Sequence, residues 1–162
     1  MIKVIFFIWT AFISDKELNC SCFPISVEDD VKKSHIIFTG KILKLDTLRI
    51  TDEYIPKGAF RIHYLATIQA SRVFKGNNLQ DTVYIITGNG EADCGFPFER
   101  NKDYLVYANE QTYTIIDSLE VIGSKFRSRK MKYFTTSICD RTTMAIKEEE
   151  KLLVSYLSKT KL

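Results

Sequence analysis

The residues with the clearest chemical potential are Cys20 and Cys22, which are separated by Ser21 and preceded by a short apolar N-terminus. The chain has four cysteines, and the other two, Cys94 and Cys139, lie far away in the sequence. Disulfides from a Cys-x-Cys pair to two distant points would fix a chain terminus that normally frays. If the chain is cut just before Cys20, the free α-amine and the neighbouring carbonyl oxygen form a rigid pair of metal ligands.

Residues 1–19 have the features of a secretory signal peptide. Lys3 is followed by the apolar run Val4–Ile13, which has no amphipathic period, and then by a polar stretch. The run is too short to span a bilayer as a mature helix, although a buried N-terminal strand or helix has a similar composition. We therefore expect a secreted, extracellular protein with no stable membrane insertion after the signal is removed.

Residues 20–162 are long enough for one domain with its own core and too short for two ordinary domains. Four cysteines in an exported chain of this size most simply form two disulfides. A bond between Cys20 and Cys22 would close a strained ring, which leaves two pairings with the distant cysteines open. The net charge of +3 is spread along the chain, and the one basic cluster, Ser124–Lys132, is interpreted as a solvated loop rather than a polyanion site.

The elements expected to position these cysteines are mostly strands. Ser26, with an acid three residues on, predicts a short helix from Val27 to about Lys33. Alternation of apolar and polar residues is clearest in Phe60–Phe74, and Gly40 inside a strand predicts the bulge that coils a sheet into a barrel. The other expected elements are a strand at His35–Leu45, a loop at Leu48–Gly58, a strand at Asp81–Thr87, a hairpin of Tyr104–Ala108 and Tyr113–Ile116 around Asn109-Glu110-Gln111, and a strand at Tyr133–Ile138.

After Cys139 the sequence pattern becomes that of a helix. The segment from Thr142 to about Ser158 predicts an amphipathic helix with an exposed Glu149. Its barrel-facing residues are expected to be Met144, Leu152, Leu153 and Tyr156. Short strands, a bulge glycine and one late helix together predict a mainly β fold: an OB-fold-like Greek-key β-barrel with a short N-terminal helix and a C-terminal helix.

Several separate segments resemble one known family, the tissue inhibitors of metalloproteinases. Their inhibitory domain is a netrin-like module built on an OB barrel, and the resemblance runs from Cys20 to about Leu157. The segments that carry it are Cys20-Ser21-Cys22-Phe23-Pro24, His35–Leu45, Arg61-Ile62-His63-Tyr64 running to Val73-Phe74-Lys75-Gly76, Ala92-Asp93-Cys94-Gly95, Asp103-Tyr104-Leu105-Val106 and Cys139-Asp140-Arg141.

The resemblance implies that the mature chain begins at Cys20, whose α-amine and carbonyl oxygen bind the catalytic zinc of a target protease. Ser21 would enter the specificity pocket, and Cys22, Phe23 and Pro24 would continue the contact. The zinc belongs to the target, so we expect no cofactor in this protein itself. The implied partners are zinc metalloproteases and, as a further class, components of the extracellular matrix.

The resemblance also assigns a second contact segment and the disulfide pairing. Glu91, Ala92 and Asp93 would form a ridge beside the N-terminus, with two acids in place of the smaller, less charged residues usual in the family. The implied disulfides are Cys20–Cys94 and Cys22–Cys139.

The chemistry of zinc agrees with this assignment. Catalytic zinc keeps an open position for water. A neutral amine can replace that water, and an α-amino pKa of about 8 leaves a useful neutral fraction at pH 7. Inhibition follows because no activated water remains to attack a peptide bond.

Other interpretations of these residues remain open. The cysteines can be purely structural in a netrin-like binding module that engages an extracellular matrix or cell-surface protein without protease inhibition. A redox Cys-x-Cys pair is weaker, because no thioredoxin-like βαβ pattern surrounds it. His35 and His63 have no acid or cysteine at ligand spacing, so they are expected to be surface or packing residues.

The sequence lacks the motifs of the common catalytic sites. It has no nucleophile elbow, P-loop or His-Glu-x-x-His pattern, so we interpret the chain as a non-enzyme. OB barrels often bind nucleic acid, but an exported, disulfide-bonded chain argues against that partner. We expect the protein to be a monomer.

Overall fold

The computed structural model describes residues 20–77, 79–88, 93–122 and 125–160, and for residues 117–122 and 125–127 it describes the backbone alone. The expected signal peptide, residues 1–19, lies outside the described residues. No helix in the described part of the chain combines the length and apolar character needed to cross a bilayer.

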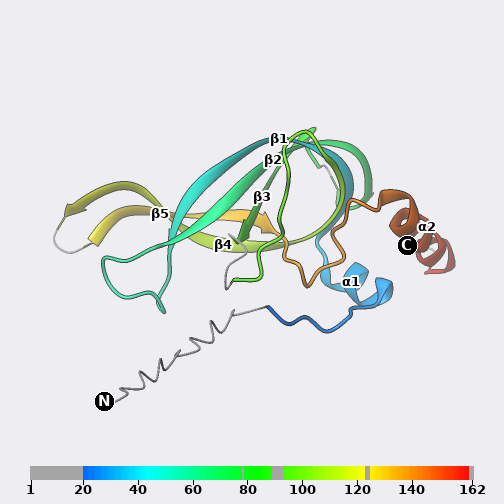
Figure 1. The fold of residues 1–162 in the computed structure, drawn as a ribbon, viewed down its shortest axis with the longest axis horizontal. Helices are drawn as coiled ribbons and strands as arrows, with labels where there is room; N and C mark the ends of the chain where they lie inside the picture. The colour runs from blue at the N-terminus through cyan, green and yellow to red at the C-terminus, as the bar shows by residue number, and fades with distance from the viewer. Residues whose placement is uncertain (1–19, 78, 89–92, 123–124, 161–162) are drawn as a thin grey trace, which may run out of the picture.

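The described strands form one closed barrel in the order β1-β2-β3-β5-β4 (Figure 1). β1 pairs antiparallel with β2 and parallel with β4, and β3 meets β5 in parallel. This order confirms the mainly β, OB-fold-like Greek-key barrel with two helices. The elements are α1 (Val27–Lys33), β1 (Ile36–Thr51), β2 (Arg61–Lys75), β3 (Thr82–Gly88), β4 (Asp103–Ile122), β5 (Lys125–Thr135) and α2 (Ile146–Thr160).

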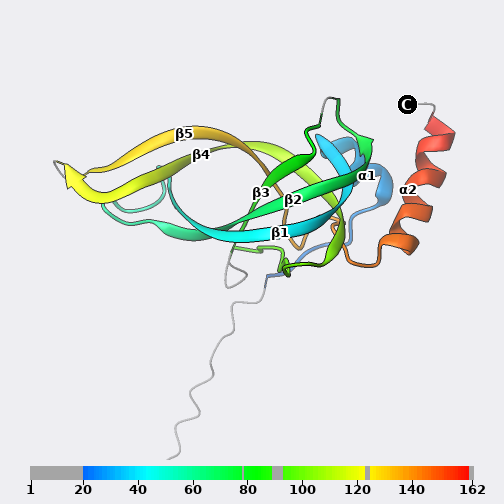
Figure 2. The ribbon, with the colours of Figure 1, turned by 90° about the horizontal axis from the view of Figure 1, so that it is seen from above.

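The short helix α1 begins where the sequence predicts. The Ser26 side-chain oxygen accepts a hydrogen bond from the backbone N–H of Asp29 (3.0 Å), which satisfies one of the unpaired donors of the first turn. The helix ends at Lys33, and the N–H of Ser34 donates to the carbonyl of Asp30 (2.8 Å). α1 and α2 lie together at one end of the barrel (Figures 1 and 2).

Gly40 has the role in barrel closure that the sequence indicated. The pairing of β1 with β2 shifts register between Thr39 and Gly40. A Cβ at position 40 would stand 2.7 Å from the carbonyl oxygen of Gln69, so only glycine lets the two strands approach this closely. β1 then continues to Thr51, so the expected loop from Leu48 is wrong at its start, because this segment extends the hairpin with β2.

The expected hairpin around Asn109–Gln111 is wrong. β4 is one continuous strand through this polar segment, which pairs with Thr135–Tyr133 of β5. Most of the basic cluster, Lys125–Lys132, therefore lies in β5 and not in a loop. β4 and β5 extend beyond the barrel as a two-stranded ribbon (Figure 1). The polar residues misled the prediction because this segment is kept extended by pairing with β5, which is remote in the sequence.

Two of the three clusters of buried side chains in the described residues lie on opposite faces of the strands. The larger fills the barrel and includes Phe38, Ile68, Ile85, Tyr104 and Val106. The smaller packs the helices against the outer face of β1 and β4, and it contains Val31, Ile37, Leu105, Tyr107 and Leu153. Alternate residues of β1 and β4 thus serve different cores, as the period of a strand requires.

The C-terminal helix is confirmed, but its start and half of its expected buried face are wrong. Thr143 exchanges backbone hydrogen bonds with Leu105 of β4 (both 2.9 Å), so the chain stays extended there and the helix starts later than predicted. Leu153 is fully buried and Tyr156 is half-buried, whereas Leu152 is 51% exposed and Met144 is 54% exposed. Glu149, expected to be exposed, is buried.

Leu153→Ala is expected to lower the free energy of unfolding by about 2–5 kcal/mol, because it removes a large buried side chain. Leu152→Ala is the matched control from the exposed face and is expected to change it by less than about 1 kcal/mol. Chemical denaturation followed by circular dichroism measures both values. Equal losses from the two variants would contradict the burial of Leu153 against β4.

Candidate functional site

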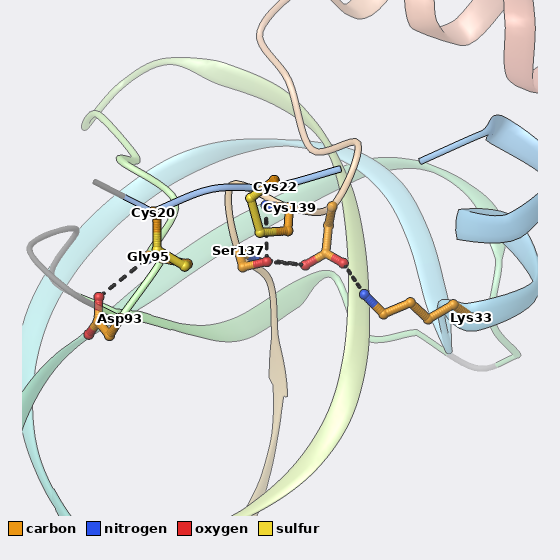
Figure 3. The surroundings of a disulfide bond; sticks show 9 residues. Cys20, Cys22, Lys33, Asp93, Gly95, Ser137 and Cys139 are labelled. Carbon is orange, nitrogen blue, oxygen red and sulfur yellow. Dashed lines mark hydrogen bonds and ion pairs between the residues drawn. A yellow bond between two sulfur atoms is a disulfide. The ribbon is translucent and has the colours of Figure 1, made fainter. Parts of the chain in front are cut away.

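The candidate site is the extended segment Cys20–Ser26, which two disulfides fasten to the barrel (Figure 3). Cys20 is bonded to Cys94 and Cys22 to Cys139, with Cα–Cα distances of 5.4 and 5.2 Å. This is the pairing that the resemblance implied. Because the two bonded residues are only two positions apart, the backbone between them is held at both ends.

The two points of attachment are themselves joined. Gly95 forms an antiparallel bridge with Ser137, and the N–H of Ile138 donates to the carbonyl oxygen of Cys94 (3.0 Å). The segments around Cys94 and Cys139 therefore act as one support. The N-terminal segment is tied to two neighbouring parts of the same surface, not to two independent loops.

Two glycines allow the Cys94 segment to lie against the end of β3. A Cβ on Gly95 would stand 2.2 Å from the backbone of Gly88, and a Cβ on Gly88 would overlap the carboxylate of Asp93. Cys94 itself has a left-handed backbone with a φ of 55°, which is uncommon for a residue other than glycine. The N–H of Phe96 donates to the side-chain oxygen of Thr87 (2.6 Å), which fixes the chain after this turn.

The side chains of the N-terminal segment alternate between the support and solvent. Cys20 and Cys22 are half-buried where they reach the barrel, whereas Ser21 is exposed and Phe23 is 93% exposed. Pro24 is exposed as well. An apolar ring this accessible in a fastened segment is available for contact with another molecule.

Of the expected second ridge, Asp93 alone is described, because Glu91 and Ala92 lie outside the described residues. The Asp93 carboxylate accepts a hydrogen bond from the N–H of Gly95 (3.2 Å; Figure 3). Asp93 also lies close enough to His63 to affect it: burial lowers the pKa of His63, and the charge of Asp93 partly opposes that shift. The structure thus brings Asp93 and Cys20 together at one edge through Cys94.

Asp140 braces the support from the C-terminal side. Its carboxylate accepts hydrogen bonds from the N–H and hydroxyl of Ser137 (2.8 and 2.9 Å) and lies 2.7 Å from the Lys33 amine (Figure 3). The Asp140 side chain is 4% exposed, and its hydrogen bond raises the pKa of Lys33. This contact links the end of α1 to the residue that follows Cys139.

Arg141 joins the N-terminal segment to the helical core. Its guanidinium forms a two-pronged ion pair with Glu149 (2.7 and 2.5 Å) and donates to the carbonyl oxygen of Ile25 (2.9 Å). Glu149 also accepts from the buried hydroxyl of Tyr107 (2.8 Å). Burial and the Glu149 carboxylate raise the pKa of Tyr107, so this hydroxyl stays protonated and remains a donor.

Asp30 completes this network from α1. It is fully buried, and its carboxylate accepts from the backbone N–H of Arg141 (2.7 Å). Burial raises the pKa of Asp30. Sequence reasoning missed this network of Asp30, Tyr107, Arg141 and Glu149. The one signal in the sequence was that Arg141 follows Cys139 by two residues.

The described residues show no resident metal centre: among them, no three His, Cys, Asp or Glu side chains form a set that could hold an ion. His35 is exposed and lies just before β1, whereas His63 is half-buried and lies in β2. No protein-family model matches the chain, and no curated protein matches it either. What the described part of the site offers chemically is a backbone segment, Cys20–Ser26, that two disulfides hold against the barrel.

Proposed function

We propose that the chain beginning at Cys20 is a secreted inhibitor of zinc metalloproteases, and that it acts by placing its terminal α-amine and carbonyl oxygen on the target's catalytic zinc. The observation that carries the proposal is the double attachment of Cys20–Pro24, which leaves Ser21 and Phe23 exposed while the backbone is fixed. The resemblance of this segment to the tissue inhibitors of metalloproteinases, as a netrin-like inhibitory domain, supplies the class of target.

Pre-organisation is the physical argument for this mode of binding. A free chain terminus would lose conformational entropy when it enters an active-site cleft, and a fastened one has already lost it. Zinc in such enzymes has an open position that an amine nitrogen can fill. The amine displaces the water that the metal would otherwise activate, so the bound enzyme cannot hydrolyse a peptide.

The exposed residues beside the amine supply contact with the protein part of the cleft. Ser21 follows the chelating residue and is small enough for a specificity pocket, while Phe23 offers an apolar ring two residues further on. Asp93 lies beside the first disulfide and adds a carboxylate to the same edge. A target with a basic or polar rim at that position fits this edge best.

The test compares two disulfide-bonded forms of the protein that differ by one residue. A form starting at Cys20 is expected to inhibit a panel of zinc metalloproteases, and a form with one alanine ahead of Cys20 is expected to lose at least about a hundredfold in affinity, because its amine is now an amide. Both should give the same circular dichroism spectrum and melting temperature. Inhibition constants from cleavage of a fluorogenic peptide are the measurement.

The N-terminus of the mature protein decides whether the form starting at Cys20 occurs naturally. Cleavage before Cys20 would place Asn19 and Glu17 at positions where signal peptidase prefers small residues, so N-terminal sequencing of the secreted protein is the first experiment. If the Cys20-start form leaves every enzyme of the panel active, the inhibitor proposal is wrong. A netrin-like module that binds a matrix or cell-surface protein is then the better account.

A further inference from the structure

The barrel closes at a seam between β3 and β5 that is paired over a short stretch. Within the described residues these strands pair at two positions alone, Ile85 with Phe134 and Ile86 with Thr135. Before these pairs the strands diverge and leave a groove of about 640 Å³. This volume is in the range of sites that hold a ligand or several side chains of a partner.

The groove has an apolar floor and a polar rim. Its apolar lining includes Ile36, Leu65, Val83, Met131, Tyr133 and Phe134. Lys132 and Glu110 stand on the rim as an exposed ion pair, with 2.7 Å between amine and carboxylate. A partner that enters the groove therefore meets apolar surface inside and charge at the edge.

The backbone of β3 has hydrogen-bonding groups that face this groove. Peptide groups of an antiparallel strand point alternately to its two sides. The carbonyl of Asp81 accepts from Ala70 of β2 (2.8 Å), whereas that of Ile86 accepts from the chain just after β5 (3.4 Å). By this alternation the N–H and C=O groups of Thr82 and Tyr84 face the seam, where β3 has no paired residue of β5.

The β5 side of the seam is basic. Lys130 is exposed and lies on the same face of β5 as Lys132, whose side chain is 73% exposed although its amine pairs with Glu110. Pairing of β5 with the same strand of a second copy would place like charges opposite one another, which disfavours self-association. The charge instead complements an acidic partner.

We propose that this seam binds an extended acidic segment of another protein, which adds as a strand along β3. Its backbone would pair with the peptide groups of Thr82 and Tyr84, and its alternate apolar side chains would fill the groove. Its acidic side chains would lie beside Lys130 and Lys132. The β2–β3 turn at one end of the groove and the Cys20–Ser26 segment lie at opposite sides of the molecule in Figure 2, so both surfaces can be occupied at once.

The test uses the disulfide-bonded protein and a fluorescein-labelled peptide in which glutamate alternates with valine or leucine. Fluorescence anisotropy is expected to show binding that is at least about tenfold tighter than that of the same peptide with lysine in place of glutamate. The double variant Lys130→Glu/Lys132→Glu should reverse this preference. Its matched control, Lys147→Glu/Lys151→Glu, makes the same change of charge on the exposed face of α2 and should keep it.

A second measurement tests strand pairing without altering the protein. Methylation of alternate backbone nitrogens of the glutamate peptide should weaken binding about tenfold, because it removes hydrogen bonds while keeping the side chains. Unchanged affinity would overturn the proposal, as would equal binding of the glutamate and lysine peptides. Binding of inorganic polyphosphate as tight as that of the peptide, or a dimer in sedimentation that Lys130→Glu/Lys132→Glu dissociates, would assign the seam to a polyanion or a second copy instead.

Discussion

Glu149→Ala is expected to be among the most destabilising single substitutions in the chain, with a loss of about 3–5 kcal/mol in the free energy of unfolding. The carboxylate is buried and accepts hydrogen bonds from Arg141 and Tyr107. Its removal leaves the Arg141 guanidinium, which is 23% exposed, without its two-pronged partner, and the Tyr107 hydroxyl without its acceptor. Denaturant unfolding of the purified variant gives the value.

Two control variants separate the causes of this loss. Glu148→Ala removes a neighbouring, exposed acid from the same first turn of α2 and should change stability by no more than about 0.5 kcal/mol. Glu149→Gln keeps an acceptor for Tyr107 but removes the charge that faces Arg141, so its effect should be intermediate. A Glu149→Ala variant as stable as Glu148→Ala would show that the ion pair contributes nothing net to folding.

The second large effect is expected from loss of the disulfide that closes the longer loop. Cys22 and Cys139 are 117 positions apart, and on the chain-entropy model a cross-link over such a loop stabilises the folded state by about 4–5 kcal/mol. Cys22→Ser/Cys139→Ser should therefore lower stability by roughly this amount. Made in the form that starts at Cys20, this variant retains the terminal residue and its bond to Cys94.

Cys22→Ser/Cys139→Ser should also inhibit more weakly, and the cause is separate from the loss of stability. With one attachment instead of two, the backbone through Ser21 and Phe23 regains freedom that binding must again remove. The inhibition constant should rise about tenfold or more under conditions where circular dichroism shows the protein still folded. Unchanged inhibition by a folded double variant would mean that the Cys20–Cys94 bond alone orders the segment.

Local signals in the sequence predicted α1, Gly40 and the strands that alternate. Ser26 is followed by an acid and Gly40 interrupts a β-branched run, and each of these signals acts within a few residues. The continuity of β4 was not predictable in the same way. Asn109–Gln111 has the composition of a turn, and only its pairing with β5, remote in the sequence, keeps it extended.

The candidate site, like the fold, was predicted from the sequence only in part. Cysteine chemistry and a family resemblance gave the attachment of Cys20 and Cys22. The Arg141–Glu149 pair could not be foreseen, because the helical pattern placed Glu149 among exposed acids. Its burial depends on Tyr107 and Arg141, which reach it from β4 and from the segment before α2. Tertiary contacts of this kind leave no periodic trace in the sequence.

The joining of the first cysteines to Cys94 and Cys139 also sets the order in which the protein can mature. Of the four cysteines, Cys20 and Cys22 are synthesised first, but the second bond cannot form until the chain has been made as far as Cys139. Until then both early thiols compete for Cys94, and a wrong bond must be reshuffled, on a timescale of seconds to hours. The cysteines that are synthesised first are therefore the last to be fully paired, and their pairing requires oxidising conditions.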